Sequence, residues 1–292
     1  MSAITLVAER PYRTARRLFW TRMLGNPQAM IGMIICVLYF LLGGLGPALT
    51  SHSYSQQNLM ETFARPLTDS HLLGTDHLGR DLFARLATGA RISLLVGFGV
   101  TAISMLVGVC FGVLAGYFRG WVDTVISAVI EFTWGFPLIL IAVILTGAFG
   151  PGLKATVLAI GLINWAGFAR IIRGEVLRLR ELEFIQAARA IGAGDRRILL
   201  KHVLPNIVAP VLVMTSYYVA LAIIAEAGLS FIGMGAQPPL PSLGVMIADG
   251  RNYLLLDHWI STIPGVAIIL IVMGLNFLGD GLRDVLDPRL RR

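Results

Sequence analysis

The stretch around which this chain is organised is Phe184 to Pro205, which reads FIQAARAIGAGDRRILLKHVLP. Four apolar residues recur in it at the i, i+3, i+4 and i+7 spacing of one helix face: Phe184, Ala187, Ala188 and Ile191. Gly192 and Gly194 follow this face, and glycine accepts the left-handed backbone angles that end many helices. The spacing therefore predicts a short amphipathic helix that stops at a glycine turn.

A second short helix is predicted directly after this turn. Asp195 is a residue type that caps a helix, and Pro205 should close the helix that it begins. Arg189 lies off the apolar face and belongs to a basic rim. The whole stretch is thus expected to form a helix–turn–helix elbow, suited to contact with a partner protein in the cytoplasm.

The composition places this elbow in a membrane protein. The chain has 292 residues, of which 56% are hydrophobic and 14% are charged, whereas soluble domains average about 25% charged residues. Residues 1–26 hold five arginines and one glutamate, and residues 170–205 hold eight basic and four acidic side chains. A basic surplus beside apolar runs is typical of cytoplasmic segments, so the net charge of +7 does not indicate nucleic-acid binding.

The apolar runs predict an all-α polytopic fold with six transmembrane helices. The expected spans are 27–49, 92–116, 125–149, 153–169, 207–234 and 259–278. The expected regions are a cytoplasmic basic arm (1–26), the first transmembrane helix (27–49), an extracytoplasmic loop with an amphipathic helix (50–91), a five-helix core (92–281) that carries the elbow (170–205), and a cytoplasmic tail (282–292). Both termini are therefore expected in the cytoplasm.

Glycines and a proline mark two of these spans. Gly135 and Pro137 should kink the third. In the second, Gly108, Gly112 and Gly116 form a smooth stripe that admits a close helix, which could belong to this chain or to a partner.

Charged and histidine side chains offer few candidate sites. Glu131 and Glu226 are the acidic residues within the expected spans, where a charge is costly. Glu226 is a candidate to line a pore, or equally a hydrogen-bonded strut between helices, and Glu131 is expected to be structural. His71 and His77 are expected in a solvated loop rather than a metal site.

The elbow resembles the EAA loop of permease subunits of bacterial ABC importers. The resemblance rests on Gln186-Ala187-Ala188, then Gly192, then Leu204-Pro205, with Gln186 and His202 departing from the usual pattern. It implies that the loop inserts into a groove on an ATPase subunit. The residues expected to couple the two chains are Phe184, Gln186, Ala187, Ala188, Arg189, Gly192 and Asp195.

A second segment, LLGTDHLGRDLFARLATGARISLLVG at residues 72–97, is similar to the C-type permeases of dipeptide, oligopeptide and nickel importers. This resemblance implies a bacterial inner-membrane protein that forms half of a pore with a second homologous permease, surrounded by membrane lipid. It also implies two ATP-binding subunits and an extracytoplasmic solute-binding protein. No cofactor is expected in this chain, and ATP and Mg are expected on the ATPase subunits.

Alternatives remain at this point. Peptides are the first expectation for the substrate, and nickel or a metal chelate is the second. The remoter alternative is a stand-alone ion-coupled transporter, which would require paired charges at mid-membrane and an internal repeat. An enzyme is not expected, because the sequence has neither a P-loop nor a His-Glu-x-x-His motif.

Overall fold

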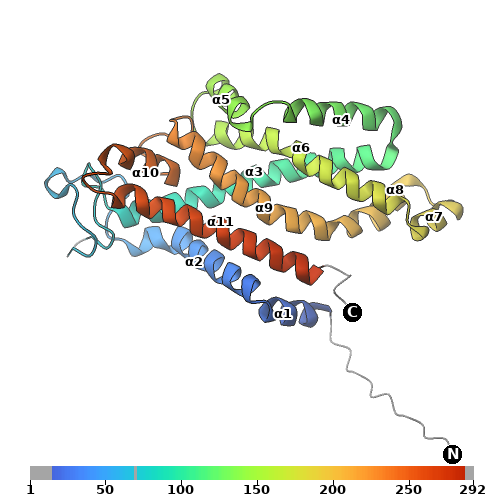
Figure 1. Cartoon of the computed structure of the whole chain (residues 1–292), viewed down its shortest axis with the longest axis horizontal. Helices are drawn as coiled ribbons and strands as arrows, with labels where there is room; N and C mark the ends of the chain where they lie inside the picture. The colour runs from blue at the N-terminus through green and yellow to red at the C-terminus, as the bar shows by residue number, and fades with distance from the viewer. Residues whose placement is uncertain (1–14, 69–70, 287–292) are drawn as a thin grey trace, which may run out of the picture.

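The computed structural model describes residues 15–68 and 71–286, and in these ranges the protein is built of helices (Figure 1). A short helix α1 (Ala15–Gly25) precedes α2 (Pro27–Leu49), and α3 (Leu82–Phe118) follows a long loop. Then come α4 (Gly120–Trp134), α5 (Leu138–Phe149) and α6 (Leu153–Arg180). The rest is α7 (Glu183–Ala190), α8 (Asp195–Ile198), the π-helix η2 (Leu199–Val203), α9 (Leu204–Phe231), α10 (Leu243–Gly250) and α11 (Trp259–Leu286), with short 3-10 turns η1 (Leu59–Glu61) and η3 (Arg251–Tyr253).

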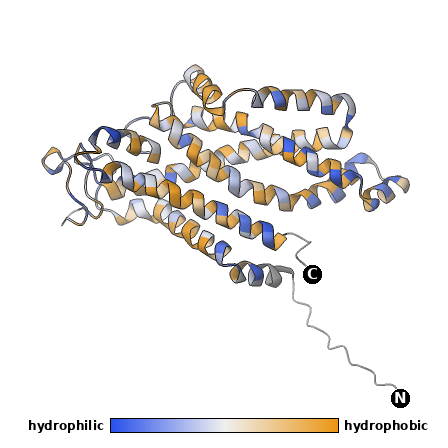
Figure 2. Cartoon of the chain, viewed as in Figure 1, coloured by the Kyte–Doolittle hydropathy of each residue, from blue (hydrophilic) through white to orange (hydrophobic). Residues whose placement is uncertain are grey.

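Five of these elements are long and apolar enough to cross a membrane, namely α2, α3, α6, the run from α8 through α9, and α11. If the pair α4 and α5 counts as one span, the described residues hold six. This pair is bent by 89° where Gly135 and Pro137 interrupt it. The predicted kink is therefore confirmed and is sharper than a bend within one helix. Figure 2 shows that hydrophobic residues cover the long helices.

Helices α3 and α6 form the central contact of the bundle, and the glycine stripe explains it. A Cβ atom added at Gly108 would lie 2.4 Å from the Phe168 Cβ, and one at Gly112 would lie 2.7 Å from the Ala169 carbonyl oxygen. A Cβ at Gly116 would lie 2.8 Å from the Arg173 carbonyl oxygen. The stripe thus serves packing within this chain, which settles one of the alternatives left open by the sequence.

Two expected boundaries differ from the observed ones. Helix α3 begins at Leu82, so the predicted amphipathic helix of the 50–91 loop and the second span are one continuous helix. Asp81 caps it, because its Oδ1 accepts the Ala84 backbone N–H at 2.6 Å. The predicted loop after the fifth span also contains a helix, α10, whose first turn is capped by Ser242.

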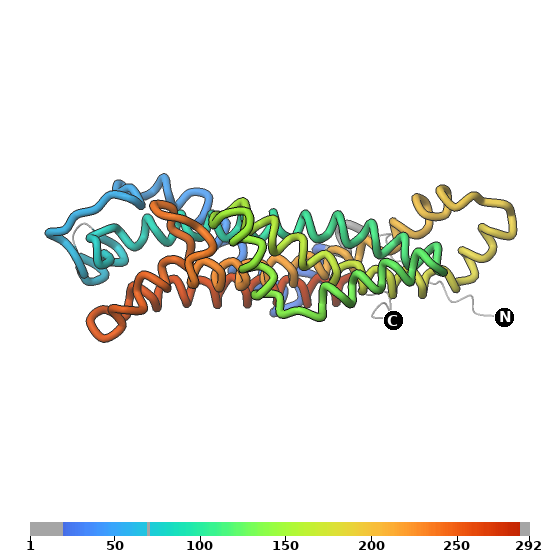
Figure 3. Tube along the Cα trace, turned by 90° about the horizontal axis from the view of Figure 1, so that it is seen from above, coloured from blue at the N-terminus to red at the C-terminus, as the bar shows by residue number. Residues whose placement is uncertain are grey.

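The bundle is elongated and has two different ends (Figure 3). Helices α7 and α8 form a hook that projects from one end, and the loop between α2 and α3 lies at the other end together with α10. Helix α1 and the end of α11 lie toward the end of the hook (Figure 1). The predicted arm and tail fall partly on residues 1–14 and 287–292, outside the described residues.

Candidate functional site

The hook formed by α7, α8 and the turn between them is the predicted elbow. Helix α7 ends in a Schellman motif: the Gly192 N–H donates to the Arg189 carbonyl at 2.9 Å, and the Ala193 N–H donates to the Ala188 carbonyl at 3.0 Å. Gly192 has φ +82, so the prediction that glycine ends this helix is confirmed there. Gly194 has an ordinary φ of −68 and acts as the N-cap residue of α8.

The apolar residues of α7 divide between two sides. Ile185 is fully buried and Ala188 is 7% exposed, and both pack in the cluster that joins the hook to α3 and α6. Phe184 and Ile191 are 42% and 86% exposed, and Ala187 is also exposed. The expectation of a single face was therefore wrong for Ala188, which anchors the hook, and the sequence reasoning missed Ile185.

The second half of the elbow also differs from its prediction. Asp195 does not cap α8 through its side chain; its Oδ1 instead accepts the Tyr117 hydroxyl at 2.6 Å. Pro205 does not close a short helix either. Through the wider turn of η2, the helix runs on into α9, where Pro205 is the second residue. Pro205 has no backbone N–H to donate, and it lies directly after the π turn.

Tyr117, at the end of α3, is an anchor that no sequence pattern indicated. Its hydroxyl donates to Asp195, and its carbonyl oxygen accepts from the Arg180 guanidinium. The Arg189 guanidinium lies over its ring, 5.2 Å from the centroid. Gln186 is exposed and donates to the Glu181 carbonyl at 3.1 Å. The hook is therefore tied to the end of α3 by polar contacts from both of its helices.

Outside this anchored side, the hook presents an exposed surface of mixed character. Three exposed apolar side chains, Phe184, Ala187 and Ile191, lie at i, i+3 and i+7, and we call them the apolar face of α7. Exposed basic residues lie beside them on the following turns: Arg196, Arg197 and Lys201. The arrangement suits contact with a protein surface that has an apolar groove and acidic edges.

At the opposite end of the bundle, a charged cluster holds the long loop and α10 to the start of α3. Arg85 is 2% exposed, and its guanidinium contacts Asp249 at 3.0 Å and Asp76 at 3.5 Å. Arg80 contacts Asp76 at 2.7 Å and Asp249 at 3.1 Å. The two arginines and two aspartates balance in charge, which allows Arg85 and Asp76 to be buried while Arg80 and Asp249 stay partly exposed.

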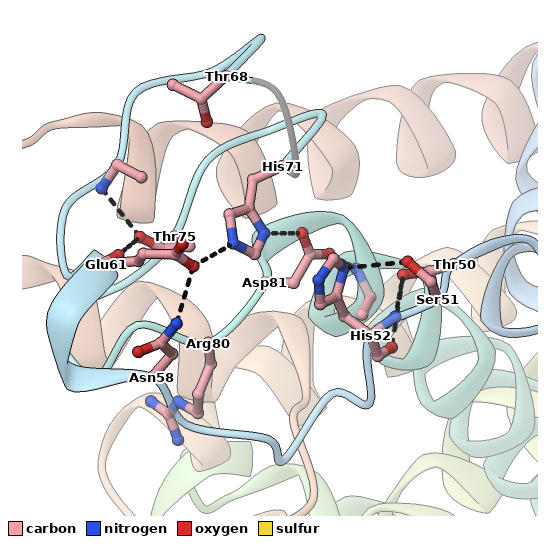
Figure 4. A network of polar contacts seen from close by, with 12 residues as sticks. Thr50, Ser51, His52, Asn58, Glu61, Thr68, His71, Thr75, Arg80 and Asp81 are labelled. Carbon is pink, nitrogen blue, oxygen red and sulfur yellow. Dashed lines mark hydrogen bonds and ion pairs between the residues drawn. The ribbon is translucent and has the colours of Figure 1, made fainter.

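His71 lies next to this cluster and is buried, so the expectation of a solvated loop was wrong for it. Its Nδ1 lies 2.7 Å from Asp81 Oδ2, and its Nε2 lies 3.2 Å from Glu61 Oε2 (Figure 4). Burial by itself lowers the pKa of His71, but the hydrogen bonds to the two carboxylates outweigh it and raise the pKa above its ordinary value. His77 is partly buried and stacks on the Tyr253 ring at 5.0 Å.

The two acidic residues expected within spans occupy different settings. Glu226 is fully buried in α9, where Oε1 accepts the Ser230 hydroxyl at 2.5 Å. It faces no open surface in this conformation, and Ser230 lies one turn further along α9, so this hydrogen bond does not join two helices. The strut between helices and the pore-lining role both stay predictions. Glu131 is exposed on α4. Near it, Asp123 and Arg173 join α4 to α6 through contacts of 2.5 and 2.8 Å.

Comparison with known proteins identifies relatives along the whole chain. Residues 108–292 match the sequence model of the binding-protein-dependent transport system inner membrane component. Residues 14–66 match that of the N-terminal TM domain of oligopeptide transport permease C. The chain is 42% identical to a dipeptide transport system permease protein of Bacillus subtilis strain 168, covering 94% of this chain and 85% of that one.

A glutathione transport system permease protein of Pectobacterium atrosepticum is 35% identical over 100% of this chain and 97% of its own. Among solved structures, the MetNI methionine ABC transporter in an inward-facing conformation matches with a TM-score of 0.58 at 20% identity. That match covers 69% of this chain and 96% of the other, and it shows a shared fold.

Proposed function

Because this chain belongs to the family of binding-protein-dependent transport system inner membrane components, we propose that it is the permease subunit of an ABC importer of peptides. The two named relatives and the N-terminal family model bear the names of dipeptide, glutathione and oligopeptide transport, and all three of these solutes are peptides. Such a permease forms one half of a pore, and a second homologous permease forms the other half. A solute-binding protein delivers the peptide from outside the bacterial inner membrane.

The observation that carries this proposal is the apolar face of α7 at the end of the hook. Phe184 and Ile191 expose large apolar side chains to solvent although Ile185, on the same short helix, is fully buried. An apolar face that protrudes on an anchored hook is suited to enter a groove on another protein. In this proposal the groove belongs to one of two ATPase subunits, which bind ATP and Mg.

The orientation follows from the charges on and near the hook. Residues 170–205 hold eight basic and four acidic side chains, and the hook therefore lies on the cytoplasmic side. Both termini lie on the same side, and the loop between α2 and α3 lies outside with α10. ATP binding draws the ATPases together, the two hooks move with them, and the bundles rock between inward-open and outward-open states.

The test uses the assembled transporter with three single variants of α7. Ala187→Glu and Ile191→Glu place a carboxylate on the apolar face. Ala190→Glu is the matched control, since Ala190 is exposed on the same helix and lies on the side of the acidic Glu183, two turns further along. Burying an unpaired carboxylate in a docking contact costs several kcal/mol, about a hundredfold or more in affinity.

We expect the two face variants to lose co-purification with the ATPase subunits and to abolish peptide uptake in proteoliposomes, while the control retains both. All three chains should insert in the membrane and keep the helical content of the wild type. Full uptake and normal co-purification by both face variants would contradict the proposal. Ala188 is unsuitable for this test, because it is buried in the hook and a glutamate there would unfold the hook itself.

A further inference from the structure

Three metal-binding side chains from separate parts of the extracytoplasmic end meet in one place. His52 follows α2, His71 lies in the middle of the long loop, and Asp81 caps α3 (Figure 4). Each offers one ligand atom, and these atoms all lie within 4.8 Å of one another. His71 and Asp81 are buried and His52 is partly buried, so the side chains meet inside the loop rather than on its surface.

The hydrogen bonds around Asp81 leave one of its oxygens for a cation. Its Oδ1 accepts the Ala84 backbone N–H at 2.6 Å in the N-cap of α3. Its Oδ2 lies 2.7 Å from His71 Nδ1. The cap therefore fixes the carboxylate so that the second oxygen points at the imidazole.

The other side of His71 is held in the manner of a metal ligand. Glu61 Oε2 lies 3.2 Å from His71 Nε2, and the same oxygen accepts the Asn58 side-chain amide at 2.9 Å. A carboxylate on one imidazole nitrogen fixes the proton there and directs the lone pair of the other nitrogen at the metal. With Nε2 protonated, His71 Nδ1 and Asp81 Oδ2 are both acceptors, and they face each other only with a cation or a proton between them.

His52 offers the third donor that a metal ion would need. The ring centroid of His52 lies 4.7 Å from that of His71. The Ser51 hydroxyl lies 3.4 Å from His52 Nδ1, so Ser51 does not occupy the other ring nitrogen, Nε2. A proton shared by His71 and Asp81 needs no third donor. A transition-metal ion does, because two imidazoles and a carboxylate supply three of its ligands and leave one position open.

We propose that His52, His71 and Asp81 bind one resident divalent cation of the zinc class at the extracytoplasmic end of this protein, with Glu61 orienting His71. The mixed nitrogen and oxygen donors favour Zn²⁺ over Mg²⁺ or Ca²⁺, which take oxygen ligands. Metal–ligand bonds of about 2.0 Å put tetrahedral ligand atoms roughly 3.3 Å apart. On binding, His71 Nδ1 and Asp81 Oδ2 therefore move apart from their 2.7 Å separation.

The ion would fasten the long loop to both helices that it joins. It is a structural ion and not cargo, so its binding is independent of the proposed transport function. The test therefore measures binding to the full chain in lipid nanodiscs, after treatment with a chelator, and uses zinc chloride and cobalt chloride as probes.

Two single variants give the contrast. His52→Ala removes a partly buried ligand from the edge of the network and leaves the Asp81 cap in place. His258→Ala is the matched control, because His258 is exposed at the same end of the protein and lies outside the cluster. We expect one zinc ion per wild-type chain, at least tenfold weaker binding in His52→Ala, and unchanged binding in His258→Ala.

Cobalt gives a second measurement that a purely structural role of His52 would not change. The wild type and His258→Ala should show the visible absorption of four-coordinate cobalt, and His52→Ala should lose it. Equal helical content of the metal-free chains excludes misfolding as the cause. If the wild type binds no zinc, or if His52→Ala binds zinc as tightly as the wild type, the proposal is refuted and a proton alone joins His71 to Asp81. Zinc binding that persists in a chain unable to transport peptides would count against the proposed function only.

Discussion

The seam between α3 and α6 allows a sharp test, because Gly108 lies against backbone that cannot yield. A methyl group at this position would lie 2.6 Å from the Trp165 carbonyl oxygen and 3.0 Å from the Ala169 nitrogen. It would also lie 2.4 Å from the Phe168 Cβ, a side-chain atom fixed directly on the backbone. Ordinary contact begins at 3.4 Å, so Gly108→Ala must push the two helices apart locally.

The size of the effect follows from two opposing contributions. Replacing glycine by alanine inside a helix stabilises it by about 1 kcal/mol. Overpacking in a close-packed core costs about 1–3 kcal/mol, and the upper end applies here because the three nearest atoms belong to the backbone or adjoin it. We therefore expect Gly108→Ala to lower the free energy of unfolding by about 1–2 kcal/mol once the helix contribution is subtracted.

Gly99→Ala on the same helix provides the control. A Cβ at Gly99 would meet only Val157 Cγ1, at 3.5 Å, which is ordinary contact. This variant should keep the helix contribution without the clash and unfold at or above the wild-type temperature. The assay is thermal unfolding of the purified chain in detergent, followed by circular dichroism. Equal unfolding temperatures for the two variants would refute the close packing of α3 on α6 through Gly108. They would favour packing of the glycine stripe against a partner permease instead.

The other predictions concern backbone strain, buried charge and a buried carboxylate. Gly192→Val puts a β-branched residue at φ +82, a strain that costs about 1–2 kcal/mol or more. We expect it to uncouple ATP hydrolysis from uptake. Gly194→Ala, at φ −68, should leave both rates unchanged. Arg85→Met removes the buried partner of Asp76 and Asp249, although Arg80 still contacts both. It should destabilise the chain by about 1–3 kcal/mol in chemical unfolding, while the same change at the exposed Arg91 should have no measurable effect. Glu226→Gln keeps an oxygen that can accept the Ser230 hydroxyl, so peptide uptake should stay within about twofold of the wild type. A collapse of uptake would favour the pore-lining role of Glu226.

The membrane helices could be predicted because their signal is composition over a long window. Runs of apolar residues locate α2, α6, α9 and α11 regardless of what packs on them. The continuity of α3 with the predicted amphipathic helix was missed for the same reason. Residues 82–91 contain two arginines, Arg85 and Arg91, so the run reads as polar although Arg85 is buried among aspartates from other segments.

The elbow was predicted in place but only partly in detail. The turn at Gly192 depends on local backbone angles, which the residue type itself indicates. The assignment of Ala188 to an exposed face failed because spacing defines which residues share a side of a helix, and not which side meets the protein. The π-helix before Pro205 was not predicted, because no local residue pattern indicated it.

The end of the bundle opposite the hook shows the same limit more strongly. His52, His71 and Asp81 are separated by long stretches of loop, and no spacing rule relates them. They meet because Asp81 caps α3, and because backbone bonds such as Leu82 N–H to the Gly74 carbonyl fold the loop back over the cap. The chemistry of such a site follows from the loop's tertiary path, which residue order alone does not contain.

The anchored hook and the glycine seam belong to one mechanical unit. Tyr117, which holds Asp195 and Arg189, lies one residue beyond Gly116, the last glycine of the seam. The carboxyl end of α6 leads directly into α7 of the hook. Val176 of α6 and Ile185 of α7 belong to the same buried cluster. A force applied at α7 is therefore received by α3 and α6 together, and close backbone packing leaves these helices little room to slide. In a transporter of the proposed kind, the pair would rotate as one body, and the flexibility needed for alternating access would lie elsewhere, with the 89° break between α4 and α5 as the place where the chain is least continuous.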